Sequence, residues 1–210
     1  KLARNRLRGF DVGIEDGVPV YNNNPLPTLT FTGSPKLHGT NSGIRYEKNG
    51  TLTPQSRERD LSLLSDNHGF AAYVLKNADF WKTVCSEIIN RDDDNDYVVI
   101  FGEWAGSGIQ AKVAVSQLPK RFYIFGIEFI KEGRRDIWVD YEDLNKYVPE
   151  CINEKVDAYT ISQFPNWTID IDFNSPELVQ NKLIELTEEV ENECPVGKYV
   201  GVSSLGEGIV

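Results

Sequence analysis

The segment TLTFTGSPKLHGTNSGIRYEKNGTLTPQ, residues 28–55, is the part of the sequence that best defines the fold. Residues 28–32 alternate between polar and apolar side chains and run into a Gly-Ser-Pro turn, which predicts a strand that ends there. Lys36 follows the turn at once, and Gly39 comes three residues later. The sequence therefore predicts an amine at a tight turn where a ligand can come close to the backbone.

Hairpins account for most of the strands that we expect. Residues 42–47 and 51–55 flank Lys48-Asn49-Gly50, and an Asn-Gly pair favours the positive φ angles of a tight hairpin turn. Residues 131–133, Lys-Glu-Gly, mark a second hairpin turn. The further strands that we expect are residues 97–104, 121–130, 135–139, 198–202 and 208–210.

Two segments carry helical spacing of apolar residues. One runs over residues 70–89, with a break near Asn77 where Asp79 is a candidate cap for a second helix. The other runs over residues 176–191, with Ser175 as its N-cap. Its apolar face is expected to carry Leu178, Val179, Leu183, Leu186 and Val190. Hairpins with helices set between them predict an α+β domain of antiparallel β-sheets flanked by helices.

The composition is that of one globular domain, which we place over residues 1–210. Hydrophobic residues make up 40% and charged residues 26%. Apolar stretches such as residues 97–101 are far too short to span a bilayer. The basic start at residues 1–8 is not followed by the apolar stretch of a secretory signal. We therefore expect no membrane partner and a cytoplasmic protein, encoded by a cell or by a virus acting in its host's cytoplasm.

The cysteines and the charge narrow the function classes. The three cysteines lie far apart without a C-x-x-C pair, which suits reduced thiols and excludes a recognisable zinc site; they are Cys85, Cys151 and Cys194. The net charge of −10 opposes general phosphate binding, but much of the acid is concentrated at residues 92–96 and 185–193, which we expect to be solvated. A cleft elsewhere can still attract anions, because local fields depend on the residues that face it.

Lys36 is the candidate nucleophile. A lysine amine is a poor nucleophile at its ordinary pKa near 10.4, and it becomes useful where neighbouring cations or a metal favour its neutral form. Taken alone, the motif favours a surface lysine in a turn over a nucleophile, because short motifs often match by chance.

Four further blocks follow the lysine in order: SRER at 56–59, FGEWAGSGIQ at 101–110, RFYIFGI at 121–127 and GEGIV at 206–210. Together with PKLHGTN at 35–41, they resemble the collinear motifs of covalent nucleotidyltransferases, and specifically the RNA ligase 2 type of tailed phages. The resemblance covers about residues 28–210. DNA ligases and mRNA capping enzymes usually have Asp-Gly where this chain has His38-Gly39, so the histidine favours the RNA ligase branch.

The resemblance implies a nucleotidyltransferase fold with sheets and helices around an ATP cleft. It also implies that Lys36 takes AMP covalently from ATP. His38 would assist the chemistry or orient pyrophosphate, and Leu37 belongs to the nucleotide site. Asn41 matches a residue that binds phosphate or metal-bound water. Arg57 matches an arginine that contacts the nucleotide, with Arg59 as the rival if the register is shifted.

Three residues further along complete the implied site. Glu103 matches the family residue that bonds the ribose, and Glu207 matches the metal-binding position. Phe125 matches the aromatic that stacks on adenine, although the strand around it is also rich in aromatics typical of a core. We expect Mg²⁺ or Mn²⁺, held by Glu207 and Asn41, since both metals accept the same oxygen ligands.

Two departures from the family pattern leave alternatives open. A final Lys-x-Lys motif follows the glutamate in relatives, and the sequence ends at Val210 before it, so we expect a piece of a longer protein. Gly126 stands where some phage relatives have an acid. We expect a monomeric ligase that joins RNA 3′-OH and 5′-phosphate ends for RNA repair. The alternatives are a DNA ligase or capping enzyme, and a non-catalytic module that binds nucleotides or RNA ends.

Overall fold

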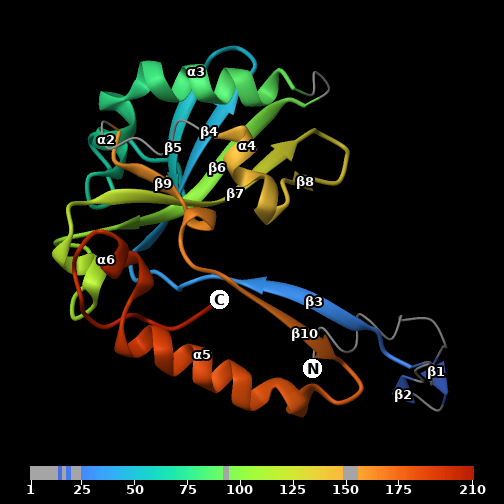
Figure 1. Ribbon diagram of the computed structural model, residues 1–210. Coiled ribbons are helices and arrows are strands. Elements are labelled where there is room, and N and C mark those ends of the chain that lie inside the picture. The colour runs from blue at the N-terminus through green and yellow to red at the C-terminus, as the bar shows by residue number, and fades with distance from the viewer. Residues whose placement is uncertain (1–13, 16–17, 20–24, 92–94, 149–155) are drawn as a thin grey trace.

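The computed structural model describes residues 14–15, 18–19, 25–91, 95–148 and 156–210 (Figure 1). A six-stranded sheet in the order β5-β4-β6-β7-β8, with β9 beside β7, forms the centre of the fold. Its neighbours pair antiparallel except β7 and β9, which are parallel. The strands are β4 (Thr40–Glu47), β5 (Leu52–Ser56), β6 (Tyr97–Ala105), β7 (Arg121–Ile130), β8 (Ile137–Trp138) and β9 (Ala158–Thr160).

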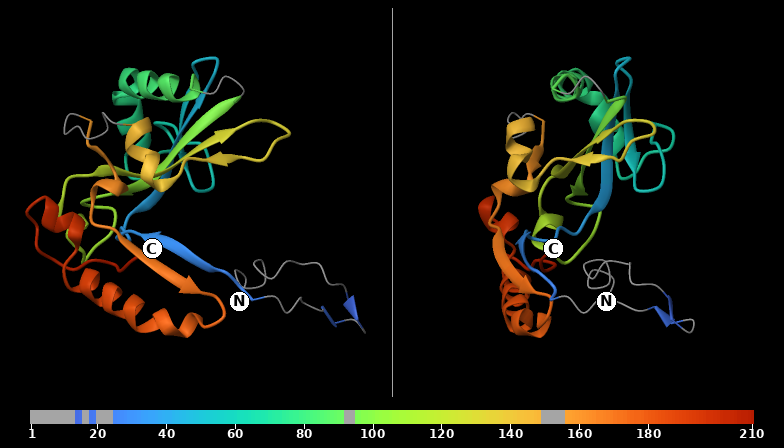
Figure 2. Two further views of the ribbon diagram at one scale, coloured as in Figure 1. Left: turned by 45° about the vertical axis from the view of Figure 1, so that its right-hand side comes forward. Right: turned by 90° about the vertical axis from the view of Figure 1, so that its right-hand side faces the viewer.

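A second, two-stranded sheet projects away from the first (Figures 1 and 2). It pairs β3 (Thr28–Gly33) with β10 (Trp167–Asp172) in antiparallel register over their full length. The strand expected at residues 28–32 is thus confirmed, whereas the sequence patterns did not predict β10. A short antiparallel pair, β1 (Ile14–Glu15) with β2 (Val18–Pro19), precedes it.

Helices α2 (Phe70–Lys76) and α3 (Ala78–Ile89) pack on one face of the six-stranded sheet, where Figure 1 shows them above the strands. The other helices are α4 (Leu144–Tyr147), α5 (Gln180–Asn192) and α6 (Pro195–Tyr199), with 3₁₀ turns η1 (Ala114–Gln117), η2 (Tyr141–Asp143), η4 (Ile161–Gln163) and η5 (Pro176–Val179). The mixed α+β architecture with mainly antiparallel sheets agrees with the expectation from sequence.

Aromatic side chains hold the helices on the sheet. Phe70 of α2 packs against Phe122 of β7 and Trp104 of β6, with ring centroids 5.1 and 5.5 Å apart. Trp81 of α3 has no exposed surface and meets Phe122 edge-on. Complete burial of each such ring contributes about 2–3 kcal/mol, so this face is firmly closed. The opposite face of the strands is left available for a site.

Several boundaries differ from the expected ones. Asn77 alone separates α2 from α3, so the second helix begins before Asp79, and Asn77, not Asp79, occupies the N-cap position. Ser175 makes no capping hydrogen bond, and the helix after it opens as the 3₁₀ turn η5. Leu178 in that turn is 76% exposed, so the expected apolar face holds only from Leu183 onward, with Leu186 and Val190 buried.

The C-terminal strands were also predicted wrongly. Residues 198–202 are not a strand: Lys198 lies within α6, which Pro195 opens from the first helical position that suits a proline. Within residues 208–210, Ile209 forms only an isolated bridge with Pro35.

The first hairpin turn uses its glycine differently from the expected tight turn. Gly50 takes φ of 87° and its N–H donates to the Glu47 carbonyl, while Asn49 keeps a negative φ. The Asn49 side chain instead accepts a hydrogen bond of 2.8 Å from the Thr51 N–H.

Among the described helices, none combines the length and the apolar character needed to cross a membrane. Cys85 and Cys194 are buried, and neither forms a disulfide within the described residues. Cys151, the basic start and the acidic residues 92–94 lie outside the described residues.

Candidate functional site

A cavity of about 470 Å³ opens at one end of the six-stranded sheet. It lies on the face opposite the helices: Ser42 and Ile44 are buried toward α3, so the alternating Asn41 faces the other way. Glu103 pairs with Asn41 across the strands, and Tyr123 pairs with Glu103, which places all three on the same face. The cavity is lined by every site residue expected from sequence, namely Lys36, Leu37, His38, Asn41, Arg57, Glu103, Phe125 and Glu207.

Backbone pairing between the lysine loop and the end of the chain closes one wall. The Lys36 N–H donates to the Gly208 carbonyl at 2.9 Å. Ser34 and Val210 exchange two hydrogen bonds of 2.8 and 2.9 Å. These bonds bring Glu207 beside the lysine although 171 positions separate the two residues.

Glu207 contacts both candidate catalytic side chains. Its Oε1 forms an ion pair with Lys36 Nζ, and its Oε2 lies 3.1 Å from His38 Nδ1. Oε2 is buried and accepts no hydrogen bond from the described residues, because the approach of the imidazole lacks hydrogen-bond geometry. The Lys36 side chain is 47% exposed, so the ion pair adds little stability and leaves the amine accessible from the cavity.

Glu103 is held by the loop that carries the lysine. Its Oε1 accepts a hydrogen bond of 3.0 Å from the Gly39 N–H. Burial raises the pKa of Glu103 above the ordinary value and the charge of Glu207 raises it further, while the Gly39 N–H, Lys36 and Arg57 lower it. The raised pKa reflects a poorly solvated carboxylate, which makes Glu103 a candidate site residue together with its place on the cavity wall.

Gly39 permits this close approach. A Cβ atom there would lie 2.5 Å from the Trp104 carbonyl oxygen and 2.8 Å from the Ala105 Cβ. Any side chain would therefore push the lysine loop off strand β6. The Lys-x-His-Gly pattern thus has a steric cause in this structure.

A β-bulge explains the position of Phe125. Phe101 of β6 pairs with Gly126, and the next residue, Gly102, pairs with Ile124, so Phe125 has no partner across the strands. Bulges re-aim side chains near functional sites. The Phe125 ring is 40% exposed and lines the cavity, whereas Phe122 and Phe129 on the same strand are buried. Core packing, the alternative left open by the sequence, is thereby excluded for Phe125.

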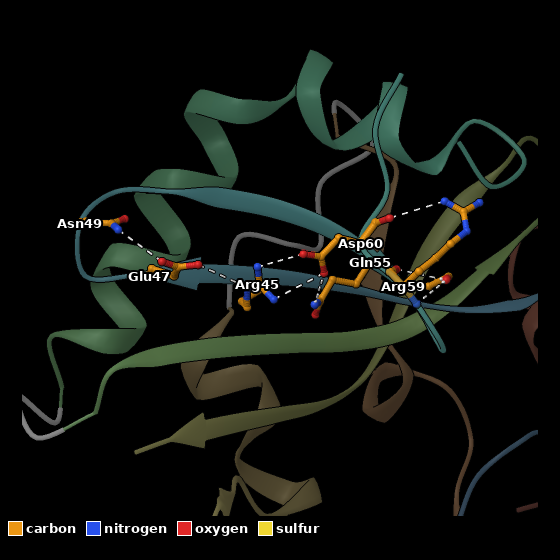
Figure 3. A network of polar contacts seen from close by, with 7 residues as sticks. Arg45, Glu47, Asn49, Gln55, Arg59 and Asp60 are labelled. Carbon is orange, nitrogen blue, oxygen red and sulfur yellow. Dashed lines mark hydrogen bonds and ion pairs between the residues drawn. The ribbon is translucent and has the colours of Figure 1, made fainter. Parts of the chain in front are cut away.

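Arg57 and Arg59 have different surroundings, and Figure 3 shows Arg59 within a network of polar contacts. The Arg59 guanidinium donates to the Ser65 carbonyl and hydroxyl at 2.8 and 2.9 Å and to the Asp66 carbonyl at 3.3 Å. Arg57 lines the cavity, and its guanidinium makes no hydrogen bond to the described part of the chain. The structure therefore favours Arg57 over Arg59 for an anion.

The cavity residues can hold a divalent cation only together with the phosphate oxygens of a bound ligand. No cluster of three His, Cys, Asp or Glu side chains that could hold a metal exists within the described residues. The available donors are Glu207 Oε2, which accepts no hydrogen bond from the described residues, and the Asn41 side chain, and both residues line the cavity. Mg²⁺ is commonly held by one or two carboxylates together with phosphate oxygens and water. The donor set fits such a shared ion.

Gln110, Tyr123 and Ile161 are among the lining residues that were not assigned a role from sequence. Gln110, whose Nε2 donates to the Gly39 carbonyl at 3.4 Å, belongs to a quoted block but had no stated role. Tyr123 lies two residues before Phe125, a spacing that could have indicated it; burial raises its pKa to about 12. Ile161 follows β9, and no sequence signal pointed to it.

A family model described as RNA ligase matches residues 30–210 of this sequence. The chain belongs to the RNA ligase family. No curated protein matches the chain in sequence.

The fold of this RNA ligase family member is shared with solved structures. A Lys-to-Ala mutant of the Naegleria gruberi RNA ligase with ATP and Mn is similar at a TM-score of 0.55 and 15% identity, covering 86% of this chain and 45% of that one. A Lys-to-Met mutant of the same ligase with AMP and Mn gives 0.56 and 14%, with the same coverage. The chain thus spans less than half the length of these ligases. The nucleotidyltransferase fold predicted from sequence is confirmed.

Proposed function

We propose that this domain is the nucleotidyltransferase part of an ATP-dependent RNA ligase, which joins RNA 3′-OH and 5′-phosphate ends through a lysyl-AMP intermediate and acts in RNA repair. The observation that carries the proposal is the cavity in which the Lys36 amine, the Glu207 carboxylate and the exposed Phe125 ring meet. The family match over residues 30–210 and the fold shared with ligases that hold ATP or AMP support it.

In the first step, Lys36 Nζ forms a bond to the α-phosphorus of ATP, and the bond from that phosphorus to the bridging oxygen breaks, so that pyrophosphate leaves. The amine must give up a proton before its lone pair can attack. Glu207 Oε1 is the carboxylate in contact with Nζ and is the proposed acceptor. AMP then passes to the RNA 5′-phosphate, and the 3′-OH displaces it.

The remaining residues position the nucleotide. Phe125 offers a ring face to adenine, and Glu103 offers a carboxylate oxygen to the ribose. The planar guanidinium of Arg57 suits phosphate or sugar oxygens. Glu207 Oε2 and Asn41 would hold Mg²⁺ or Mn²⁺, which offsets charge on the phosphate oxygens when bound.

The test is covalent labelling with ATP that carries radioactive phosphorus at the α position. The parent protein is expected to retain label through denaturation, and Lys36→Ala to retain none. Lys82→Ala, on α3 at the opposite face of the sheet, is the matched control and is expected to label like the parent. Equal labelling of Lys36→Ala and the parent would overturn the mechanism.

Two further measurements separate the alternatives. Labelling from GTP but not ATP would indicate a capping-type enzyme. A protein that binds ATP but forms no covalent adduct would be a binding module. Joining of a 5′-phosphorylated RNA, with a matched DNA as the comparison, tests the proposed substrate.

A further inference from the structure

An aromatic pair lies on the cavity face of the sheet, outside the cavity itself. Phe101 of β6 and Trp138 of β8 stack with ring centroids 5.3 Å apart and an interplanar angle of 24°. Trp138 pairs across the strands with Glu128 of β7, which places the indole on the cavity face of the sheet. Trp138 is nevertheless 53% exposed. One ring face covers Phe101, and much of the remaining indole surface is open to solvent.

Two glycines shape the surface around this pair. The site of a Cβ on Gly126 lies 2.9 Å from Trp138 Cζ3, so any side chain there would displace the indole. Gly43 pairs with Phe101 across the strands, and its Cβ site lies 3.5 Å from Phe101 Cδ1, so the Phe101 ring rests against this glycine. Both glycines are buried beneath the aromatic pair, which lies close to the strands because neither position carries a side chain.

The aromatic pair adjoins the nucleotide cavity. Gly126 directly follows Phe125, so the Trp138 indole lies beside the residue whose ring faces the cavity. Along β6, Phe101 lies two residues from Glu103, a separation of about 7 Å. A polymer that enters the cavity with one end can therefore reach Trp138 with its next units.

We propose that Trp138, supported by Phe101, is a stacking platform for an unpaired base of the RNA strand whose end is processed at Lys36. This proposal rests on the proposed RNA ligase function. Proteins that bind single-stranded nucleic acid stack successive bases on exposed aromatic side chains, often on the face of a β-sheet. A half-exposed indole stacked on a phenyl ring is suited to that use.

The platform differs from ordinary packing in the chemistry that it needs. If Trp138 only shields Phe101 from water, any apolar side chain of similar size can replace it. If Trp138 stacks a base, a flat aromatic ring is required. Trp138→Leu and Trp138→Phe therefore separate the two roles, and Ile137→Ala is the matched control, since Ile137 is an exposed apolar neighbour on the opposite face of the same strand.

The experiment measures the affinity of each protein for a single-stranded oligoribonucleotide with a 5′-phosphate and a 3′-OH. A second set of oligonucleotides carries one abasic nucleotide, moved stepwise from each end. Trp138→Leu is expected to bind the intact RNA roughly 5- to 100-fold more weakly than the parent, whereas Trp138→Phe and Ile137→Ala remain within about threefold. In the parent, one abasic position near an end is expected to cost a similar factor, and that cost is expected to vanish in Trp138→Leu.

The outcomes distinguish the stacking platform from the proposed RNA ligase function on which it rests. Equal RNA affinity of Trp138→Leu and the parent, at equal thermal stability, would overturn the platform while labelling of Lys36 stayed intact. A weakened Trp138→Leu that is still equally sensitive to every abasic position would also overturn it, since the loss would not involve a base. Loss of Lys36 labelling in the parent would refute the ligase mechanism and leave the RNA-binding measurement to stand by itself.

Discussion

The two faces of the six-stranded sheet carry different kinds of residues, although the same strands form both. The face under α2 and α3 is closed by buried aromatic rings such as Phe70 and Trp81. The other face carries carboxylates, glycines and rings with exposed surface, and a cavity opens in it. The first face follows from hydrophobic burial along each strand. The second departs from that pattern at a bulge and at glycines, and those departures mark the functional site.

Phe122 and Phe125 provide the sharpest test of this contrast, because they lie three residues apart on β7. Phe122→Ala removes a fully buried ring and is expected to lower the free energy of unfolding by about 3–5 kcal/mol. Phe125→Ala removes a partly exposed ring and is expected to cost less than about 1.5 kcal/mol of stability, while weakening ATP binding roughly 5- to 100-fold by loss of stacking. Urea unfolding and ATP titration measure the two effects. The contrast fails if both variants lose stability equally.

Gly39→Ala tests how closely the lysine loop must lie on β6. The new Cβ would overlap the Trp104 carbonyl, so the loop must shift, at a cost of about 1–3 kcal/mol in stability. The shift would also break the hydrogen bond from the Gly39 N–H to Glu103. We expect labelling of Lys36 to fall much more than the change in unfolding free energy accounts for. Gly50→Ala, at a hairpin turn far from the cavity, is the control and is expected to lose stability through its positive φ without losing labelling.

Variants of the two arginines after β5 are expected to differ in effect, one on ATP binding and the other on stability. Arg57→Ala is expected to reduce affinity for ATP by about tenfold or more, with little change in stability, since a hydrogen bond to a charged group contributes about 1.5–3 kcal/mol. Arg59→Ala is expected to show the reverse, a loss of about 1 kcal/mol in stability, because its guanidinium ties together residues 65 and 66. Thermal unfolding and ATP titration of both variants decide the assignment. A binding defect confined to Arg59→Ala would mean that the motif is shifted by two residues.

The sequence predicted the fold class and the residues that line the cavity better than it predicted the boundaries of the helices and strands. The motif blocks identified Lys36 and Glu207 although 171 positions separate them, because the resemblance carries long-range information that periodicity lacks. Periodicity could not reveal the bulge at Phe125, since a single unpaired residue exchanges the two faces of a strand. It also mistook residues 198–202 for a strand, where Pro195 starts a helix whose short length leaves no clear period. The roles of the site residues remain predictions.

Glu103→Gln is expected to produce the smallest effect, and one with a defined dependence on pH. Burial raises the pKa of Glu103 in the folded protein, so between the unfolded and folded pKa values the folded state binds more protons than the unfolded state. Stability contributed by the protonated carboxyl is therefore present at pH values below the unfolded pKa and is lost as the pH rises through the folded one. The glutamine amide is neutral throughout and can still accept the Gly39 hydrogen bond, so the variant avoids this loss.

The unfolding free energy of Glu103→Gln should match that of the parent below the ordinary pKa of a glutamate and exceed it as the pH rises through the raised pKa of the folded protein, as followed by urea denaturation at each pH. Glu58→Gln, at an exposed position beside Arg57, is the matched control. If the difference in unfolding free energy between the variant and the parent stayed constant with pH, the folded protein would solvate Glu103 well. Burial would then not raise the pKa of Glu103. A difference that grew as expected, together with weaker ATP binding, would show that the protein keeps a costly carboxylate at this position because the nucleotide requires it.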